Sequence, residues 1–151
     1  MRTVGQVCNR ELTLCVPEAT VSEVAILMRR DHVGSVIVVD DPRPGFRRAI
    51  GIVTDRDLVV EVVATGLDAS TITVGDIMRR NLVTVEESCS IHETVEIMRD
   101  KGVRRLPVLA PGGELVGIVT ADDVLDLVAG ALQDLAKTIV REQCRESVER
   151  R

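Results

Sequence analysis

Gly51-Ile-Val-Thr54-Asp-Arg-Asp57 returns later in the chain as Gly117-Ile-Val-Thr120-Ala-Asp-Asp123. The repeat extends upstream, because much of residues 3–39 recurs, shifted by 70, at residues 73–109. The register then slips by four within residues 41–49, which predicts a longer loop in the first copy. Such a period indicates one structural unit written twice, with the copies burying a face against each other. Two related clefts are therefore expected where the copies meet.

Composition predicts a single globular domain. The 151 residues are 45% hydrophobic and 28% charged, values typical of a chain that folds around a core. The formal net charge of −5 argues against a general nucleic-acid binder, which normally presents a basic face. With no Trp, no Tyr and one Phe, the chain also lacks the aromatic platforms on which single strands stack. A planar ligand would have to be held by aliphatic side chains and backbone edges.

The sequence predicts a soluble, cytoplasmic protein without a metal site. Its first residues lack the apolar core of a signal peptide, and the apolar run 36–39 is too short to span a bilayer. The four cysteines show no Cys-x-x-Cys spacing, and the two histidines are scattered. Cys15 and Cys89 are expected to be buried as small apolar residues, whereas Cys144 is expected on an exposed tail.

Three segments in each copy match the capping box that begins a helix, Ser/Thr-x-x-Asp/Glu/Gln. They lie at 3–6, 20–23 and 54–57, and again at 73–76, 90–93 and 120–123. The first of each set opens only a short turn, because Gly5 or Gly75 follows at once. Short apolar runs at 12–16, 35–39 and 49–53, and at 82–85, 106–109 and 115–119, predict strands. Each copy is therefore an α/β (α+β) unit in the order strand, helix, strand, strand, helix.

This pattern resembles the tandem CBS domain family, also called the Bateman module. The resemblance rests on the doubled Gly-Ile-Val-Thr-x-x-Asp, on Val33-Gly-Ser-Val-Ile-Val-Val-Asp40 and on its partner Val103-Arg-Arg-Leu-Pro-Val108. It implies two βαββα repeats, 3–66 and 73–132, packed sheet to sheet with pseudo-twofold symmetry, then a C-terminal helical extension at 133–151. It also implies clefts for an adenosine-containing ligand (AMP, ADP, ATP or S-adenosylmethionine), with no cofactor required.

The resemblance assigns the ligand-binding residues. In the family the motif Asp accepts bonds from the ribose hydroxyls, as an acceptor-only carboxylate suits a diol, and the motif Thr lies near ribose and phosphate. The motif of one repeat typically faces the middle strand of the other. The first cleft is thus expected to contain Val33, Gly34, Ser35, Val36, Thr120 and Asp123. The second cleft is expected to contain Thr54, Arg56, Asp57, Val103, Arg104, Arg105, Leu106 and Pro107.

The two expected clefts differ in charge. The second groups Arg56, Arg104 and Arg105, which can form charge-assisted bonds to phosphates. The first has Asp122 in place of Arg56 and small residues in place of the other two arginines. We predict that the second cleft binds nucleotide at least tenfold more tightly, about 1.4 kcal/mol. The alternative is that Arg104 and Arg105 are solvated or pair with neighbouring acids.

The C-terminal segment predicts one long helix of about 29 residues, roughly 43 Å long, from Asp122 to about residue 151. Its apolar stripe must be covered by the module or by another chain, and we expect a homodimer formed partly through it. Beyond Glu142 the segment is polar all round and is expected to fray. The stripe consists of Leu125, Val128, Leu132, Leu135 and Ile139.

The function expected from these features is nucleotide or energy sensing by a regulatory module. These 151 residues contain no fused enzyme, channel or transporter domain, so the effector is expected to be a separate, unknown protein. An enzyme is not expected, because no phosphate-cradling glycine loop, metal cluster or nucleophile–base pair is present by spacing. The remaining alternative is a ligand-free dimeric interaction scaffold.

Overall fold

The computed structural model describes residues 2–150. Each repeat forms one three-stranded sheet: β1 (Leu14–Cys15), β2 (Ser35–Val39) and β3 (Ala49–Thr54) in the first, and β4 (Val85–Glu86), β5 (Arg105–Leu109) and β6 (Leu115–Thr120) in the second. In both, a parallel edge strand precedes an antiparallel hairpin. The hairpin loops span residues 40–48 and 110–114, which accounts for the slip of four. The predicted βαββα order is confirmed.

The helices begin at the predicted capping boxes. In α2 (Val21–Asp31), Glu23 N donates to Thr20 Oγ1 at 3.2 Å and Thr20 N donates to the Glu23 carboxylate at 2.7 Å. Its counterpart α5 (Ile91–Lys101) begins in the same way at Ser90. α3 (Asp55–Leu58) continues into a π-helical turn, η1 (Val59–Val63). Local sequence therefore sets where each helix starts.

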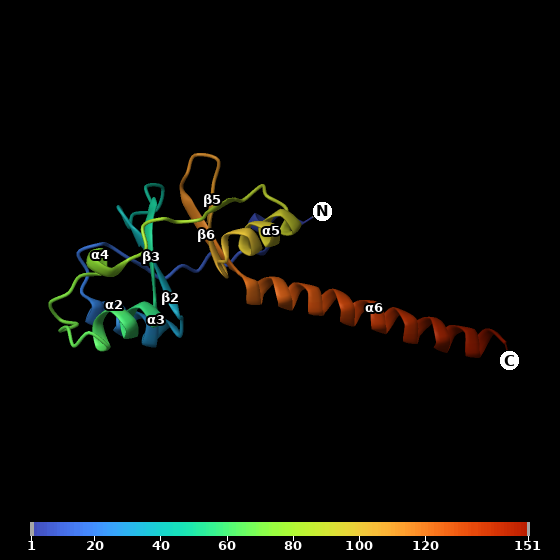
Figure 1. Cartoon of the computed structure of the whole chain (residues 1–151). Coiled ribbons are helices and arrows are strands. Elements are labelled where there is room, and N and C mark those ends of the chain that lie inside the picture. The colour runs from blue at the N-terminus through green and yellow to red at the C-terminus, as the bar shows by residue number, and fades with distance from the viewer. Residues whose placement is uncertain (1, 151) are drawn as a thin grey trace.

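The last helix, α6 (Ala121–Glu149), has the predicted 29 residues and projects away from the sheets (Figure 1). The expected fraying after Glu142 is wrong, because the helix continues to Glu149. Arg145 and Glu149 form an i,i+4 pair at 3.7 Å in this polar part, a contact that favours helix. Arg151, where the extension was expected to end, lies outside the described residues. No helix within residues 2–150 combines the length and the hydropathy of a membrane span.

Two short helices cross between the repeats. α1 (Val4–Val7) belongs to the first repeat in sequence, yet Val4 N donates to Cys89 O at 2.8 Å. α4 (Val74–Ile77) makes the reciprocal contact, with Val74 N donating to Ala19 O at 2.8 Å. Val4 joins the core of the second sheet, and Val74 joins that of the first. The two repeats are therefore interlocked, each core containing a residue of the other repeat.

The glycine of the repeated motif lies where these crossing segments pass. After α1, Asn9 pairs its backbone with Ile118 through two bonds of 2.9 Å, and after α4 Arg79 pairs in the same way with Ile52. A Cβ at Gly117 would lie 2.6 Å from Cys8 Sγ and 3.0 Å from Asn9 O. The close approach leaves no room for a side chain. It also places Asn9 and Arg79 at equivalent positions beside the two motifs.

The sheets face each other across a small shared core. Ile37 and Val39 of β2 pack with Leu115 of β6, so apolar residues of both repeats meet at this interface. The alternate residues Val36 and Val38 point to the other side, into the core beneath the helices of the first repeat. The predicted sheet-to-sheet packing is confirmed, and the two clefts lie at its margins.

Candidate functional site

The first cleft lies between the motif of the second repeat and β2 of the first, and encloses about 210 Å³. Five of the six expected residues line it, and Val36 does not. Val36 is fully buried, because side chains alternate along β2 and its neighbours Ser35 and Ile37 take the cleft side. The lining residues are Asn9, Glu11, Leu12, Thr13, Val33, Gly34, Ser35, Ile37, Arg105, Ile118, Thr120 and Asp123.

The second cleft lies between the motif of the first repeat and β5 of the second, and encloses about 350 Å³. Six of the eight expected residues line it. Leu106 is fully buried in the core for the same reason as Val36, and Asp57 is buried behind the wall. The lining residues are Ile52, Thr54, Asp55, Arg56, Arg79, Asn81, Leu82, Val83, Gly102, Val103, Arg104, Arg105 and Pro107.

The two motif carboxylates are held alike on one oxygen. Thr54 N and Oγ1 donate to Asp57 Oδ2 at 2.9 and 2.8 Å, and Thr120 N and Oγ1 donate to Asp123 Oδ2, both at 2.8 Å. These bonds form the capping boxes of α3 and α6. The motif thus fixes the orientation of each carboxylate through Oδ2. The donors that surround Oδ1 then determine what the carboxylate can bind.

The other oxygen differs between the clefts. Arg79 donates to Asp57 Oδ1 from Nη2 at 3.0 Å and from Nε at 3.3 Å. Among residues 2–150 no donor reaches Asp123 Oδ1, and Asp123 is exposed whereas Asp57 is only 6% exposed. Of the two motif aspartates, only Asp123 therefore presents an unpaired carboxylate oxygen to its cleft.

Sequence reasoning did not identify Arg79. The sequence does contain a sign of its role, because a shift of 70 places Arg79 opposite Asn9. A long cationic side chain in one repeat thus corresponds to a short neutral one in the other. This difference becomes informative only with the structure, in which α4 crosses to the first repeat and brings Arg79 to Asp57. The short Asn9 lines the equivalent position in the first cleft.

Arg105 reaches both clefts, although it was expected only in the second. Arg105 passes beside Gly34, where a Cβ would lie 3.6 Å from Arg105 Nη2, an ordinary contact, and a tighter 3.3 Å from Asp55 Oδ2. Arg104 pairs with Asp122 at 3.3 Å, as the alternative reading foresaw. Both partners are exposed, so the pair contributes about 0–1 kcal/mol and leaves Arg104 able to exchange partners.

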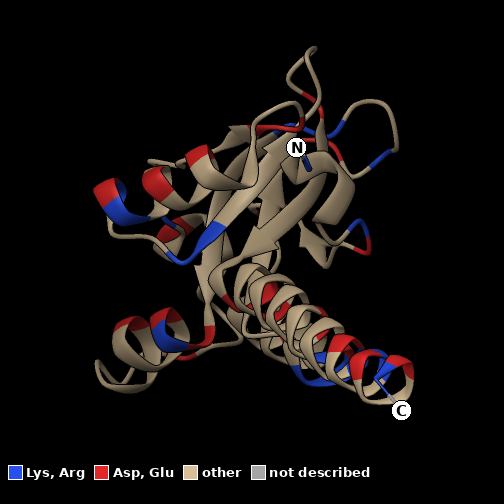
Figure 2. Cartoon of the chain, turned by 90° about the vertical axis from the view of Figure 1, so that its right-hand side faces the viewer, with Lys and Arg blue, Asp and Glu red and all other residues tan. Residues whose placement is uncertain are grey.

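Charge distinguishes the clefts, although Asp122, which was expected in the first cleft, does not line it and Arg105 does. Four arginines and one carboxylate, Asp55, line the second cleft, whereas Arg105 faces the carboxylates of Glu11 and Asp123 in the first. Elsewhere acidic and basic residues are interspersed over the helices and loops of the face in Figure 2. The basic character of the second cleft is therefore local.

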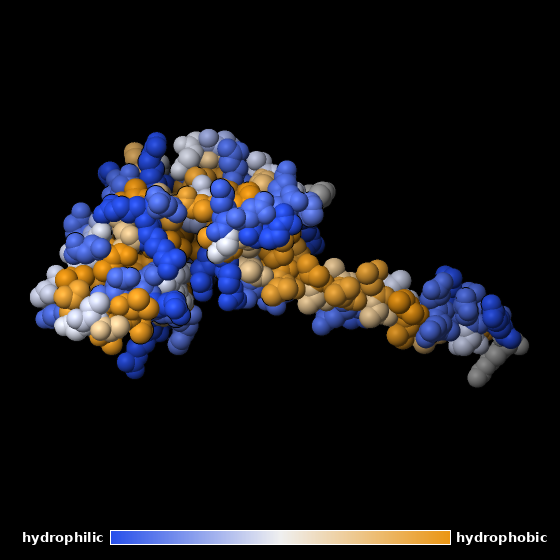
Figure 3. Space-filling model, viewed as in Figure 1, coloured by the Kyte–Doolittle hydropathy of each residue, from blue (hydrophilic) through white to orange (hydrophobic). Residues whose placement is uncertain are grey.

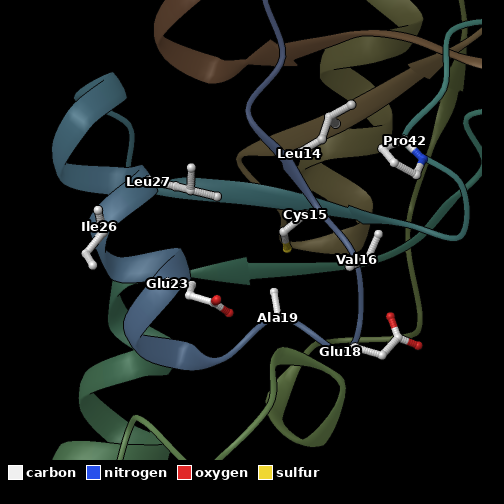
Figure 4. Close-up of a pocket in the computed structure, with 9 residues that line it drawn as sticks. All are labelled: Leu14, Cys15, Val16, Glu18, Ala19, Glu23, Ile26, Leu27 and Pro42. Atoms are coloured by element: carbon white, nitrogen blue, oxygen red, sulfur yellow. The ribbon is translucent and has the colours of Figure 1, made fainter.

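A further cavity of about 650 Å³ lies between β1 and α2 on the first repeat (Figure 4). Its wall is mainly apolar and its charged residues are Glu18 and Glu23, so it would repel phosphates. Cys15 also lines it, and burial raises the pKa of this thiol to about 11. Cys15 is buried and Cys144 exposed, as predicted, but Cys89 is only half-buried. This cavity is not suited to a nucleotide.

Comparison with known proteins identifies the family. A family model described as CBS domain matches residues 4–64 and 74–130. An uncharacterized protein of Methanopyrus kandleri is 40% identical over 125 residues, which are 83% of this chain and 62% of that protein, so the chain spans less than two thirds of this relative.

Two solved structures are similar in fold and sequence. Hypoxic Response Protein I with two coordinated zinc ions is 33% identical, with a TM-score of 0.71 over 83% of this chain and 98% of that one. The cytosolic domain of the Mg²⁺ channel MgtE in complex with ATP is 31% identical, with a TM-score of 0.70 over 83% of this chain and 48% of that one. Between residues 2 and 150, no group of three or more His, Cys, Asp or Glu side chains is placed to hold a metal ion. The chain belongs to the CBS domain family and carries two copies of the domain in tandem.

Proposed function

We propose that the protein is a cytoplasmic regulatory module that binds an adenosine-containing ligand between its two CBS repeats and signals to a separate effector protein. The arginine-lined second cleft carries this proposal, because four guanidinium groups converge there on a space of about 350 Å³. Such a volume falls within the range of small-molecule sites. The ATP complex of the MgtE domain, which is similar in fold and sequence, supports a nucleotide ligand. AMP, ADP, ATP and S-adenosylmethionine are the candidates, and the protein acts by binding rather than by catalysis.

A ligand in either cleft would contact both repeats, so its affinity depends on how the repeats are arranged. A ligand shifts a conformational equilibrium only by its differential affinity for the two states. Arg105 lines both clefts and can serve one ligand or the other. Occupancy of one cleft would then alter affinity in the other, and the coupling would be reciprocal.

We further propose that the module is a homodimer joined partly through α6. The stripe Leu125, Val128, Leu132, Leu135 and Ile139 is 49–65% exposed, and Figure 3 shows hydrophobic atoms continuing from the module along α6 until its hydrophilic outer end. Contiguous apolar surface of this kind marks an interaction site. Because α6 projects from the module, a second chain can cover the stripe along much of its length.

The proposal is tested by thermal unfolding with AMP, ADP, ATP and S-adenosylmethionine, using GTP as the control. A ligand at 100 times its dissociation constant adds about 2.7 kcal/mol and raises the midpoint by several degrees. A selective rise with an adenosine compound, weakened by Arg56→Ala, would support it. The absence of any shift at millimolar concentration would instead favour the ligand-free dimeric scaffold, for which the exposed α6 stripe is the supporting observation.

A further inference from the structure

We propose that Arg79 sets the specificity of the second cleft: it occupies the carboxylate oxygen that a ribose diol would need, so this cleft selects a polyphosphate chain without reading the sugar. The inference rests on the proposed function, since it concerns which part of a nucleotide the cleft recognises. It reverses the role expected for Asp57, which the resemblance assigned to ribose.

The first cleft is an internal control for this reading. Both motif carboxylates accept the same pair of bonds from their threonine on Oδ2. Asp57 Oδ1 accepts from Arg79, whereas Asn9 occupies the position of Arg79 in the first cleft and makes no bond to Asp123. Of the two motif carboxylates, only that of Asp123 in the first cleft therefore offers a free oxygen to the two hydroxyls of a ribose.

A ribose cannot easily displace Arg79 from Asp57. Arg79 brings a full positive charge to the carboxylate, whereas the hydroxyls of a ribose are neutral donors, so the exchange would replace an ion pair with bonds that leave the negative charge uncompensated. Asp57 is only 6% exposed, so moving the guanidinium away would leave a buried carboxylate without its counter-charge. Binding through the sugar would thus carry a penalty in the second cleft that it does not carry in the first.

Arg79 can hold Asp57 and contact a phosphate at the same time. A guanidinium has five N–H groups, and the contacts with Asp57 come from two of its nitrogens, leaving the remaining N–H groups available. Its side chain is 66% exposed and lines the cleft together with Arg56, Arg104 and Arg105. Four cations around one cleft match a chain of two or more phosphates better than a single one.

The test compares ATP, 2′,3′-dideoxy-ATP and inorganic tripolyphosphate by isothermal titration calorimetry. All proteins carry Asp123→Asn, which removes the carboxylate charge of the first cleft but keeps an oxygen for Thr120. With Arg79 present, we expect ATP and its dideoxy analogue to bind within about threefold of each other, and tripolyphosphate to bind as well. In Arg79→Asn, ATP should exceed the dideoxy analogue by about tenfold and tripolyphosphate should weaken by about tenfold (about 1.4 kcal/mol).

Arg79→Lys is the matched variant, because its ammonium group can still donate to Asp57 Oδ1. The affinities of this variant for ATP and for the dideoxy analogue should therefore stay similar. Asn is compatible with the backbone at this position, since Asn9 makes the same paired bonds with Ile118. Thermal unfolding of each variant verifies that it is folded. A tenfold preference for ATP over the dideoxy analogue with Arg79 in place would overturn this inference and leave the proposed function standing. No binding of any nucleotide or of tripolyphosphate by the unaltered protein would overturn both.

Discussion

Arg79 Nη2 lies 3.0 Å from Asp57 Oδ1, joining residues 22 positions apart in the chain. Arg79 reaches Asp57 on the segment that crosses from the second repeat to the first, so the pair forms only when the repeats are interlocked. Asp57 is buried and the guanidinium of Arg79 faces the second cleft. One ion pair therefore contributes both to the union of the repeats and to the chemistry of a cleft.

Arg79→Ala is expected to lower the free energy of unfolding by about 1–3 kcal/mol, the cost of leaving a buried acceptor without its partner. Urea denaturation measures this change. The control is Arg99→Ala, because Arg99 is exposed and pairs only with its exposed neighbour Asp100. Equal stability of the two variants would show that the buried pair contributes nothing beyond a surface pair.

Arg105→Ala is expected to weaken nucleotide binding in both clefts, by about tenfold or more where it contacts phosphate. The reason is its shared position: it lines the first and the second cleft. Calorimetric titration with ATP provides the measurement, and Arg29→Ala, an exposed arginine of α2 away from both clefts, is the control. Unchanged affinity in Arg105→Ala would contradict the placement of phosphate at this residue.

Much of the fold could be predicted from the sequence because it depends on local signals. The six capping boxes and the doubled motif gave the order of elements and the pairing of Thr120 with Asp123. The interlocking of α1 and α4 could not be predicted, since two similar segments do not reveal which copy each will contact. Val36 and Leu106 were wrongly expected to line the clefts for a different reason. A continuous apolar run does not show which face of a strand meets the cleft.

Gly117→Ala and Gly130→Ala are expected to change stability in opposite directions. At Gly117 the new methyl group would meet Cys8 and Asn9, and overpacking of this kind costs about 1–3 kcal/mol. Gly130 lies within α6 with open space around it, so alanine should stabilise the helix by up to about 1 kcal/mol. Thermal unfolding of the two variants decides the matter, and a destabilised Gly130→Ala together with a neutral Gly117→Ala would contradict the packing described here.

Ser90→Ala is expected to reduce the dependence of stability on acid pH. The Ser90 hydroxyl, and then its backbone N–H, donate to Glu93 and lower the pKa of that carboxyl. Because the folded pKa is the lower one, this stabilisation is present above the unfolded pKa and is lost as the pH falls through the folded pKa. NMR titration of Glu93 should show its pKa rising toward the ordinary value in Ser90→Ala. Ser147→Ala, at the outer end of α6, should leave it unchanged, and an unmoved pKa in Ser90→Ala would contradict the capping box.

Leu132→Glu is expected to separate the proposed homodimer into monomers, because Leu132 is 61% exposed at the middle of the α6 stripe and a charge there would be buried between chains. Sedimentation velocity measures the mass. Gln133→Glu places the same charge at the next residue, about 100° around the helix, and should leave the dimer intact. A monomeric unaltered protein would show that the stripe is not a self-association surface. A Leu132→Glu protein that remained dimeric would instead place the contact on another face, such as the exposed valines of η1.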